Sequence, residues 1–249
     1  GQNMRDHYTP RFTARAKNAE TFNERVRGLP FVAETLKWML GKPSVLSLPA
    51  TACYAFARSD PALEVNDLQI TFMPASYTEG HQSQLDDEPG MTLAAWQQRP
   101  ESVGSVRARS SDPFQAPEIR PNYLSAEVDR KVLLAGLRLA RRLMRTDAMA
   151  PYFAGELYPG DDVQTDEELI NTARERGTTT FHMIGTCRMG PGHDASAVVD
   201  HELRVRGVER LRVADASIMP TMPAANTNAA ALMIGEKAAD LVRAELVGS

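Results

Sequence analysis

The chain has 249 residues, of which 43% are hydrophobic and 24% are charged, as in an ordinary globular protein. Its 28 basic and 32 acidic residues give a formal net charge of −4 at pH 7. This argues against a nucleic-acid-binding domain, which normally carries a basic excess. Two cysteines, Cys53 and Cys187, are too few for a disulfide framework and indicate a reducing compartment. No stretch has the roughly 18 apolar residues that a membrane helix needs.

The first part of the chain mixes loop and helix signals. Pro30 is placed to open a helix over 30–40. The uncharged run 44–56 predicts a buried loop or strand. Residues 68–72 alternate between apolar and polar, which is typical of a half-buried strand. Further strand candidates lie at 91–96, 105–108 and 119–123. We expect a mostly antiparallel sheet with strands at about 67–73, 91–97 and 103–109.

Two helices are predicted in the second half of the chain before residue 180. Thr165 and Glu168 have the spacing of a capping box, which predicts a helix over 166–176. A longer helix is predicted over 126–145, because apolar residues recur there every three or four positions. This helix should back the sheet, with a buried face made of Leu133, Leu137, Ala140 and Met144.

In the C-terminal quarter, the segments 198–199 and 211–213 are predicted to form short buried strands, and a long helix is predicted over 229–247. Strands and helices interleave along the chain without a regular βαβ rhythm. This order predicts an α+β fold in which helices back an antiparallel sheet, rather than a doubly wound parallel sheet.

Three segments carry side chains suited to chemistry. His182 is followed by a Gly-Thr turn and has the character of a general base, although a lone histidine is more often structural. Asp215 and Ala216 follow a short apolar run, where they suit either a nucleotide ligand or a capped turn. Asn226 and Thr227 precede a helix, whose N-terminus attracts anions, but they are also ordinary N-caps.

Several other kinds of site are not indicated. No Cys/His pair has the spacing of a zinc site, so we expect no metal. The sequence has no phosphate-binding P-loop, no G-x-G-x-x-G and no G-x-S-x-G.

Taken in order, the segments resemble the C-terminal half of a glucose–methanol–choline (GMC) flavoprotein oxidoreductase, with the choline dehydrogenase-like branch nearest. The resemblance covers nearly the whole chain. The runs that carry it are GQNMRDH (1–7), DLQITF (67–72), RPESVGSVRARSSDP (99–113), PNYLSAEVDRKVLLAGLRLAR (121–141), FHMIGTCRMG (181–190), VVDHELRVRGVERLRVADASIMP (198–220) and NTNAAALMIGEKAADLV (226–242).

This resemblance implies an FAD-dependent enzyme that oxidises an alcohol CH–OH group to an aldehyde or ketone. In such an enzyme a proton is abstracted and a hydride passes to flavin N5. The resemblance implies that His182 and Asn226 are the catalytic residues. The cofactor-binding residues that it implies are Asp215, Ala216, Thr227 and Asn228.

The family's G-x-G-x-x-G unit, which holds the FAD pyrophosphate, has no counterpart in this sequence. The resemblance therefore implies an N-terminal FAD-binding half, in the same polypeptide or in a partner chain. It divides the chain into the end of the N-terminal region (1–66), a substrate-binding domain (67–196) and a segment that returns to the FAD domain (197–249). It also implies a small-molecule alcohol as substrate and a cytoplasmic location or attachment to the periphery of the inner membrane, and it is compatible with a homo-oligomer.

Two alternatives remain open. A flavin-containing hydroxynitrile lyase would use His182 for acid–base cleavage without redox chemistry. A non-catalytic domain that has lost FAD would explain the missing motif, but the presence of both His182 and Asn226 argues against it. By itself the chain should bind FAD poorly and expose an apolar patch around 198–199, 211–213 and the 229–247 helix.

Overall fold

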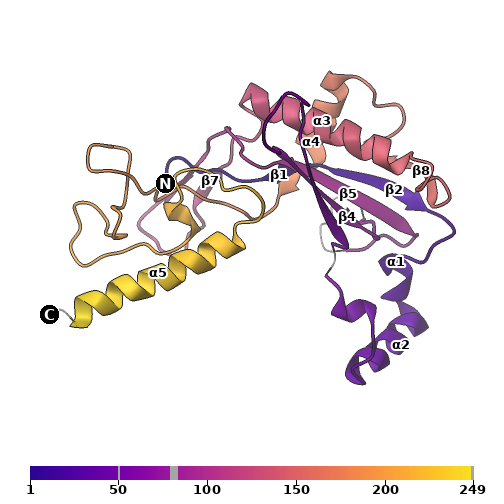
Figure 1. Ribbon diagram of the computed structural model, residues 1–249, viewed down its shortest axis with the longest axis horizontal. Helices are drawn as coiled ribbons and strands as arrows, with labels where there is room; N and C mark the ends of the chain where they lie inside the picture. Colours follow the sequence, from indigo (N-terminus) through magenta and orange to yellow (C-terminus); the bar gives the residue numbers. More distant parts are fainter. Residues whose placement is uncertain (50, 79–83, 248–249) are drawn as a thin grey trace. The chain divides into compact units, whose positions relative to one another are not determined.

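A computed structural model describes residues 1–49, 51–78 and 84–247. The chain forms two compact units, each assembled from segments that are distant in the sequence (Figure 1). The sheet unit consists of Thr9–Trp96 and Lys131–Thr178. The loop-rich unit consists of Gly1–Tyr8, Gln97–Arg130 and Thr179–Ser249. The functional division that the resemblance implies has the ranges 1–66, 67–196 and 197–249. It differs from this structural division and stays a prediction.

One five-stranded sheet, with the strand order β3-β4-β5-β2-β8, forms the centre of the sheet unit. Strand β2 pairs antiparallel with both β5 and β8, and β3 pairs antiparallel with β4. The predicted α+β fold with an antiparallel sheet backed by helices is therefore confirmed. The five strands are β2 (Arg11–Ala16), β3 (Cys53–Ala57), β4 (Leu68–Met73), β5 (Gly90–Gln97) and β8 (Phe153–Tyr158).

Helix α3 (Glu127–Met144) lies along this sheet (Figure 1). Its apolar face is buried as predicted, because each of its four residues is at most 4% exposed. Gly136 lets the helix approach closely, since a Cβ at this position would lie 2.9 Å from Leu68 Cδ1 and 3.0 Å from Ala95 Cβ. Burial of these facing side chains supplies most of the stabilisation of such a layer. The core between helix and sheet includes Phe12, Ala14, Leu68, Ile70, Leu93, Val132, Ala140 and Met144.

The composition of the sheet differs from the prediction in two strands. The segment 103–109 gives β6 (Ser105–Arg107), which pairs with β7 (Glu118–Arg120) in a separate two-stranded sheet. The prediction that it joins the main sheet is wrong. Strands β2 and β8 join that sheet instead, and neither of them was predicted from the sequence.

Burial along two strands also differs from the prediction. β4 is buried on both faces rather than half-buried, with Gln69 at 0% and Thr71 at 4% exposure. The segment 44–56 was expected to be buried, but β3 is exposed along most of its length. The reason is its place in the sheet, because β3 is an edge strand and β4 lies inside.

The other helices of the sheet unit match their sequence signals. The predicted helix over 30–40 is α2 (Gly28–Met39), and the predicted helix over 166–176 is α4 (Asp166–Arg176). The capping box of Thr165 and Glu168 forms at the start of α4. The shorter elements of this unit are α1 (Phe22–Arg25) and the 3-10 turn η1 (Val45–Ser47). The short strand β1 (Tyr8–Thr9) pairs with β9 (Thr178–Thr179) in a separate two-stranded sheet.

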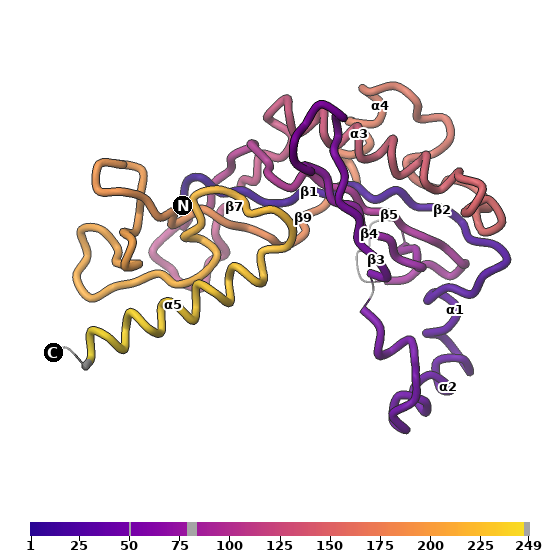
Figure 2. The backbone as a smooth tube through the Cα atoms, viewed as in Figure 1, coloured from indigo at the N-terminus to yellow at the C-terminus, as the bar shows by residue number. Residues whose placement is uncertain are grey.

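The loop-rich unit packs extended loops against the long C-terminal helix α5 (Asn228–Val247), as the tube in Figure 2 shows. The 3-10 turn η2 (Ala216–Ile218) lies in one of these loops. The segments 198–199 and 211–213 form isolated β-bridges and not the predicted strands; Val199, for example, bridges to Met189 and to Val205. The core of this unit includes Ile184, Val199, Leu203, Ile218, Met222, Ile234 and Ala238.

The surface carries apolar side chains, but only partly where the sequence analysis placed them. Val199 is fully buried, so the expectation that it is exposed is wrong, whereas Leu211 and several residues of α5 are exposed. Further exposed apolar side chains, which were not predicted from the sequence, lie on α2 and at its C-terminal end: Leu29, Trp38, Met39 and Leu40, each more than half exposed. None of the described helices has both the length and the apolar character to cross a membrane.

Candidate active site

The N-terminal segment places two polar residues beside His182. Residues 3–8 run along 179–186, and Arg5 and Ile184 exchange backbone hydrogen bonds of 3.1 and 2.9 Å. The backbone N–H of Thr180 donates to the carbonyl of His7 at 3.0 Å. This pairing brings together residues about 175 positions apart in the chain.

Asp6 holds the backbone around His182. One carboxylate oxygen of this buried residue accepts the backbone N–H of His182 at 2.9 Å. The other oxygen accepts the hydroxyl of Tyr123 at 2.6 Å and also the hydroxyl of Thr179. Burial and the hydrogen bond to Asp6 raise the pKa of Tyr123, so the phenol stays protonated and keeps donating. The ring of Tyr123 stacks on that of Tyr8, with centroids 4.4 Å apart.

His182 contacts a second histidine. Its Nδ1 lies 2.9 Å from Nδ1 of His7 and 2.9 Å from Oγ1 of Thr180. His7 is fully buried, and its Nε2 lies 2.8 Å from the carbonyl oxygen of Gln98. Burial lowers the pKa of His7 to about 4. Burial also lowers the pKa of the half-buried His182, so both imidazoles are neutral near pH 7.

Asn226 lies beside the other nitrogen of His182. Its Nδ2 is 3.2 Å from His182 Nε2, within the range of about 3–7 Å that a shared alcohol oxygen requires. The two residues that the resemblance implies as catalytic therefore lie side by side, while their catalytic roles stay a proposal. Asn226 follows Ala225, whose backbone N–H donates to the side-chain oxygen of Gln98 at 3.2 Å. Gln98 therefore contacts both His7 and the loop that carries Asn226.

The predicted cofactor-binding residues lie in the same unit, at two places. Thr227 and Asn228 stand at the start of α5, next to Asn226; Thr227 is buried and Asn228 is exposed. Asp215 caps η2 by accepting the backbone N–H of Ser217 at 2.7 Å, and Ala216 begins that turn. The backbone of η2 lies beside the segment that follows His182, with Cys187 N–H donating to Ser217 O at 2.9 Å. A cofactor role for Asp215 and Ala216 stays a prediction.

Four residues of this site were not predicted from the sequence. Asp6, His7, Gln98 and Thr180 all contact His182 or its neighbours. Asp6 and His7 stand in the run GQNMRDH, which was noted but given no role. A buried Asp-His pair is unusual enough to attract attention, but burial is not visible in the sequence.

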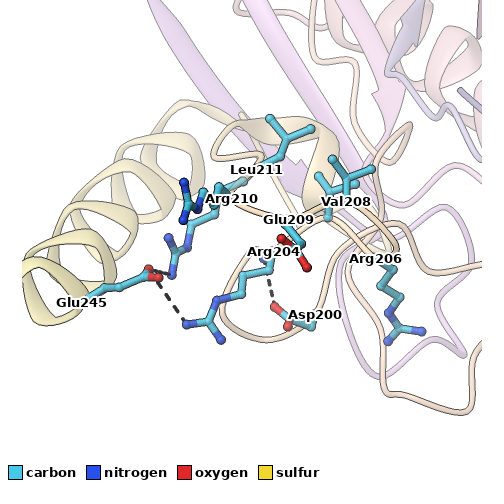
Figure 3. A pocket seen from close by; sticks show the side chains of 10 residues that line it. Asp200, Arg204, Arg206, Val208, Glu209, Arg210, Leu211 and Glu245 are labelled. Carbon is cyan, nitrogen blue, oxygen red and sulfur yellow. Dashed lines mark hydrogen bonds and ion pairs between the residues drawn. The ribbon is translucent and has the colours of Figure 1, made fainter. Parts of the chain in front are cut away.

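Two cavities lie elsewhere in the loop-rich unit. One, of about 470 Å³, is lined by residues that include Arg204 and Glu245, whose side chains form an ion pair (Figure 3). Arg212, which also lines it, forms a second ion pair with Glu245. The other, of about 880 Å³, is lined by residues that include Arg188 and Arg206. None of the six predicted site residues lines either cavity. Over the described ranges, no group of three or more His, Cys, Asp or Glu side chains could hold a metal ion.

Comparison with known proteins points to one family. Residues 100–235 match the model of the family described as GMC oxidoreductase. The chain is 34% identical over 245 residues to the mitochondrial choline dehydrogenase of Homo sapiens, an alignment that covers 98% of this chain and 41% of that protein. It is 35% identical over 247 residues to an alcohol dehydrogenase (acceptor) of Pseudomonas putida, covering 97% and 44%.

A solved structure of pyridoxine 4-oxidase from Mesorbium loti superimposes on the chain with a TM-score of 0.78 and 27% identity, covering 96% of this chain and 43% of that one. The chain thus spans about two fifths of the length of the curated relatives that it matches.

Proposed function

Because the chain belongs to the GMC oxidoreductase family, we propose that it forms the substrate-binding and catalytic part of an FAD-dependent enzyme that oxidises an alcohol to an aldehyde or ketone. The names of the relatives, choline dehydrogenase and alcohol dehydrogenase, support a CH–OH group as the electron donor. One observation carries the proposal: the side chains of His182 and Asn226 lie 3.2 Å apart, so both can reach one substrate oxygen.

His182 acts as the general base. Its lowered pKa keeps the imidazole neutral near pH 7, so that it can accept the hydroxyl proton of the alcohol. Loss of that proton raises the electron density on the carbinol carbon and favours departure of its hydrogen as hydride. The C=O bond of the product forms as the C–H bond breaks, and the proton remains on His182.

Asn226 orients the alcohol. Its side-chain amide offers a hydrogen bond to the same oxygen from which His182 takes the proton. Such alignment contributes several kcal/mol in well-oriented reactions, because it removes the entropy cost of bringing the groups together. The amide also donates to the developing alkoxide, which stabilises its negative charge.

The residues present fit a flavin. FAD, when bound, supplies the hydride acceptor. Helix α5 has 20 residues and begins at Asn228, so its first N–H groups and its dipole favour negative charge beside Asn226. Thr227 and Asn228 would hold the electron-rich edge of the flavin ring there, and Asp215 with Ala216 would hold the ribityl–pyrophosphate part. Because the sequence lacks G-x-G-x-x-G, an N-terminal half of the enzyme supplies the rest of the site.

The test is anaerobic reduction of the flavin by an alcohol in the complete enzyme, followed in a stopped-flow spectrophotometer. His182→Ala should slow flavin reduction by about 10²–10⁴-fold, with the affinity for FAD nearly unchanged. His201→Ala, which removes an exposed histidine, serves as the control and should leave the rate unchanged. A flavin that no alcohol reduces, in an enzyme that cleaves cyanohydrins, would instead support a lyase.

A further inference from the structure

We infer that His7 is a positioning residue that determines which nitrogen of His182 carries the proton. The geometry assigns the proton to Nδ1 of His182 and the lone pair to Nε2, on the side of Asn226. This inference deepens the proposed function, on which its catalytic meaning rests. The tautomer itself can be measured without substrate or cofactor.

A backbone carbonyl determines which nitrogen of His7 carries the hydrogen. The carbonyl oxygen of Gln98 can only accept a hydrogen bond, and it lies 2.8 Å from Nε2 of His7. Nε2 of His7 must therefore carry a hydrogen. Because His7 is fully buried and has a pKa of about 4, its ring is neutral and holds only one hydrogen. The Nδ1 atom of His7 is left with a lone pair.

The contact between His7 and His182 then determines which nitrogen of His182 carries the hydrogen. The two Nδ1 atoms lie 2.9 Å apart, and the rings meet nearly at right angles, with an interplanar angle of 85°. Since Nδ1 of His7 accepts, Nδ1 of His182 must donate. In the neutral ring of His182, the lone pair is then on Nε2.

Two further contacts agree with this assignment. Thr180 Oγ1 donates its hydrogen to the carbonyl of His7 at 3.0 Å and lies 2.9 Å from Nδ1 of His182, which makes the hydroxyl a second acceptor for that nitrogen. On the other side of the ring, the amide Nδ2 of Asn226 lies 3.2 Å from Nε2 and is a donor. The contacts with His7, Thr180 and Asn226 therefore all agree with a hydrogen on Nδ1 and a lone pair on Nε2.

The tautomer determines which nitrogen of His182 can act as the base. The nitrogen that must accept the alcohol proton is the one beside Asn226, and the opposite tautomer would place a hydrogen there. When His182 accepts the proton on Nε2, its Nδ1–H keeps donating to His7. The low pKa of His7 prevents that proton from moving on, so the charge stays on His182.

The direct test is nuclear magnetic resonance on the 249-residue chain labelled with 15N-histidine. His182 should show a protonated Nδ1 and a non-protonated Nε2, and a scalar coupling should connect its Nδ1 with Nδ1 of His7 across the hydrogen bond. The His182 signals are identified by their loss in His182→Gln. A protonated Nε2 on neutral His182, or a folded chain without the coupling, would overturn the inference.

Variants separate positioning from a merely structural role. His7→Leu should shift His182 toward the Nε2–H tautomer, whereas His7→Gln, whose amide can both accept and donate, should restore the Nδ1–H form. His201→Ala is the matched control and should leave the spectrum of His182 unchanged. If His7→Leu does not fold, the comparison of wild type with His7→Gln and the coupling in the wild type still decide the question.

A kinetic measurement distinguishes this inference from the proposed function. In the complete enzyme, His7→Leu should lower kcat by between about 10-fold and 10⁴-fold, the range seen when the partner of a functional histidine is removed, with little change in KM. His7→Gln should recover most of that loss. If the tautomer is as assigned but His182→Ala has no effect on flavin reduction, the proposed function fails and the tautomer assignment stands. If His7→Leu changes the tautomer but leaves kcat unchanged, the positioning role is refuted.

Discussion

The residues immediately before His182 and Asn226 both have left-handed backbones. Phe181 has φ of 60° and Ala225 has φ of 65°, although neither is glycine. Each such residue costs roughly 1–2 kcal/mol, because its Cβ approaches a carbonyl oxygen. The hydrogen bonds from Phe181 N–H to Thr179 Oγ1 and from Ala225 N–H to Gln98 Oε1 help to hold these conformations. The strain therefore lies where two side chains from distant segments are aimed at each other.

Relief of this strain gives a first prediction. Ala225→Gly should raise the free energy of unfolding by up to about 1 kcal/mol, because glycine adopts positive φ without steric cost. Ala224→Gly is the matched control: Ala224 has no positive φ, so added freedom in the unfolded chain should make that variant less stable. Urea denaturation of both variants tests the pair, and destabilisation of equal size in the two would refute the strain argument.

His7 gives the second prediction at this scale, a dependence of stability on pH. The pKa of His7 is about 4 in the folded protein and 6.5 in the unfolded chain, so the unfolded chain binds more protons between these values. The stability contributed by the neutral buried ring is present above pH 6.5 and is lost as pH falls toward 4, a loss of about 3 kcal/mol.

His7→Gln removes the titrating group and should flatten the pH dependence over that window. The measurement is the free energy of unfolding at several pH values for the wild type and the variant. Stability that rises as pH falls from 6.5 to 4, or curves of equal slope for the two proteins, would contradict the assigned pKa.

Among the elements, α3 and α5 each contain a glycine in a helix interior, and the surroundings of the two differ. Gly136 faces the side chains of Leu68 and Ala95, whereas a Cβ at Gly235 of α5 would meet nothing within 4 Å. Helix propensity favours alanine over glycine by about 1 kcal/mol at both positions. Packing opposes an alanine side chain at Gly136 only.

The third prediction follows from this contrast. Gly136→Ala should destabilise the chain by about 1–3 kcal/mol, because the added methyl pushes helix and sheet apart. Gly235→Ala should stabilise α5 by up to about 1 kcal/mol. Thermal unfolding measured by circular dichroism tests both variants, and a shift of the same sign for the two would show that the close approach of α3 to the sheet does not limit residue size.

At the scale of the whole molecule, apolar side chains remain exposed on α5 and on α2. Leu246 is 73% exposed on α5 and Met39 is 71% exposed on α2. Large exposed apolar side chains that adjoin one another are typical of an interaction site. The curated relatives are more than twice as long as this chain. In them, further sequence is present that can cover such surfaces, which explains why they are exposed here.

The fourth prediction concerns the binding of FAD. The 249-residue chain alone should bind FAD weakly and oxidise no alcohol, because Asp215, Ala216 and the start of α5 form only one wall of the proposed site. Addition of the N-terminal half should restore tight binding. Isothermal titration of FAD into the chain with and without that half tests this, and tight binding with turnover by the chain alone would refute the proposal.

The sequence by itself determined the elements that depend on local pattern. The apolar spacing of α3, the capping box of α4 and the presence of α2 were all predictable, because each signal lies within a few residues of the element that it forms. The resemblance in seven ordered runs likewise identified the family, and with it His182 and Asn226 as candidates.

Only the tertiary structure decided the partners of those elements and residues. Residues 103–109 and 11–16 both form strands, but which of them joins the main sheet depends on long-range pairing that no local pattern encodes. In the same way, His7 became part of the site because residues 3–8 pair with 179–186, across 175 positions of sequence. Burial, pKa and tautomer follow from that packing, because they depend on which groups surround a side chain and not on its neighbours in the chain.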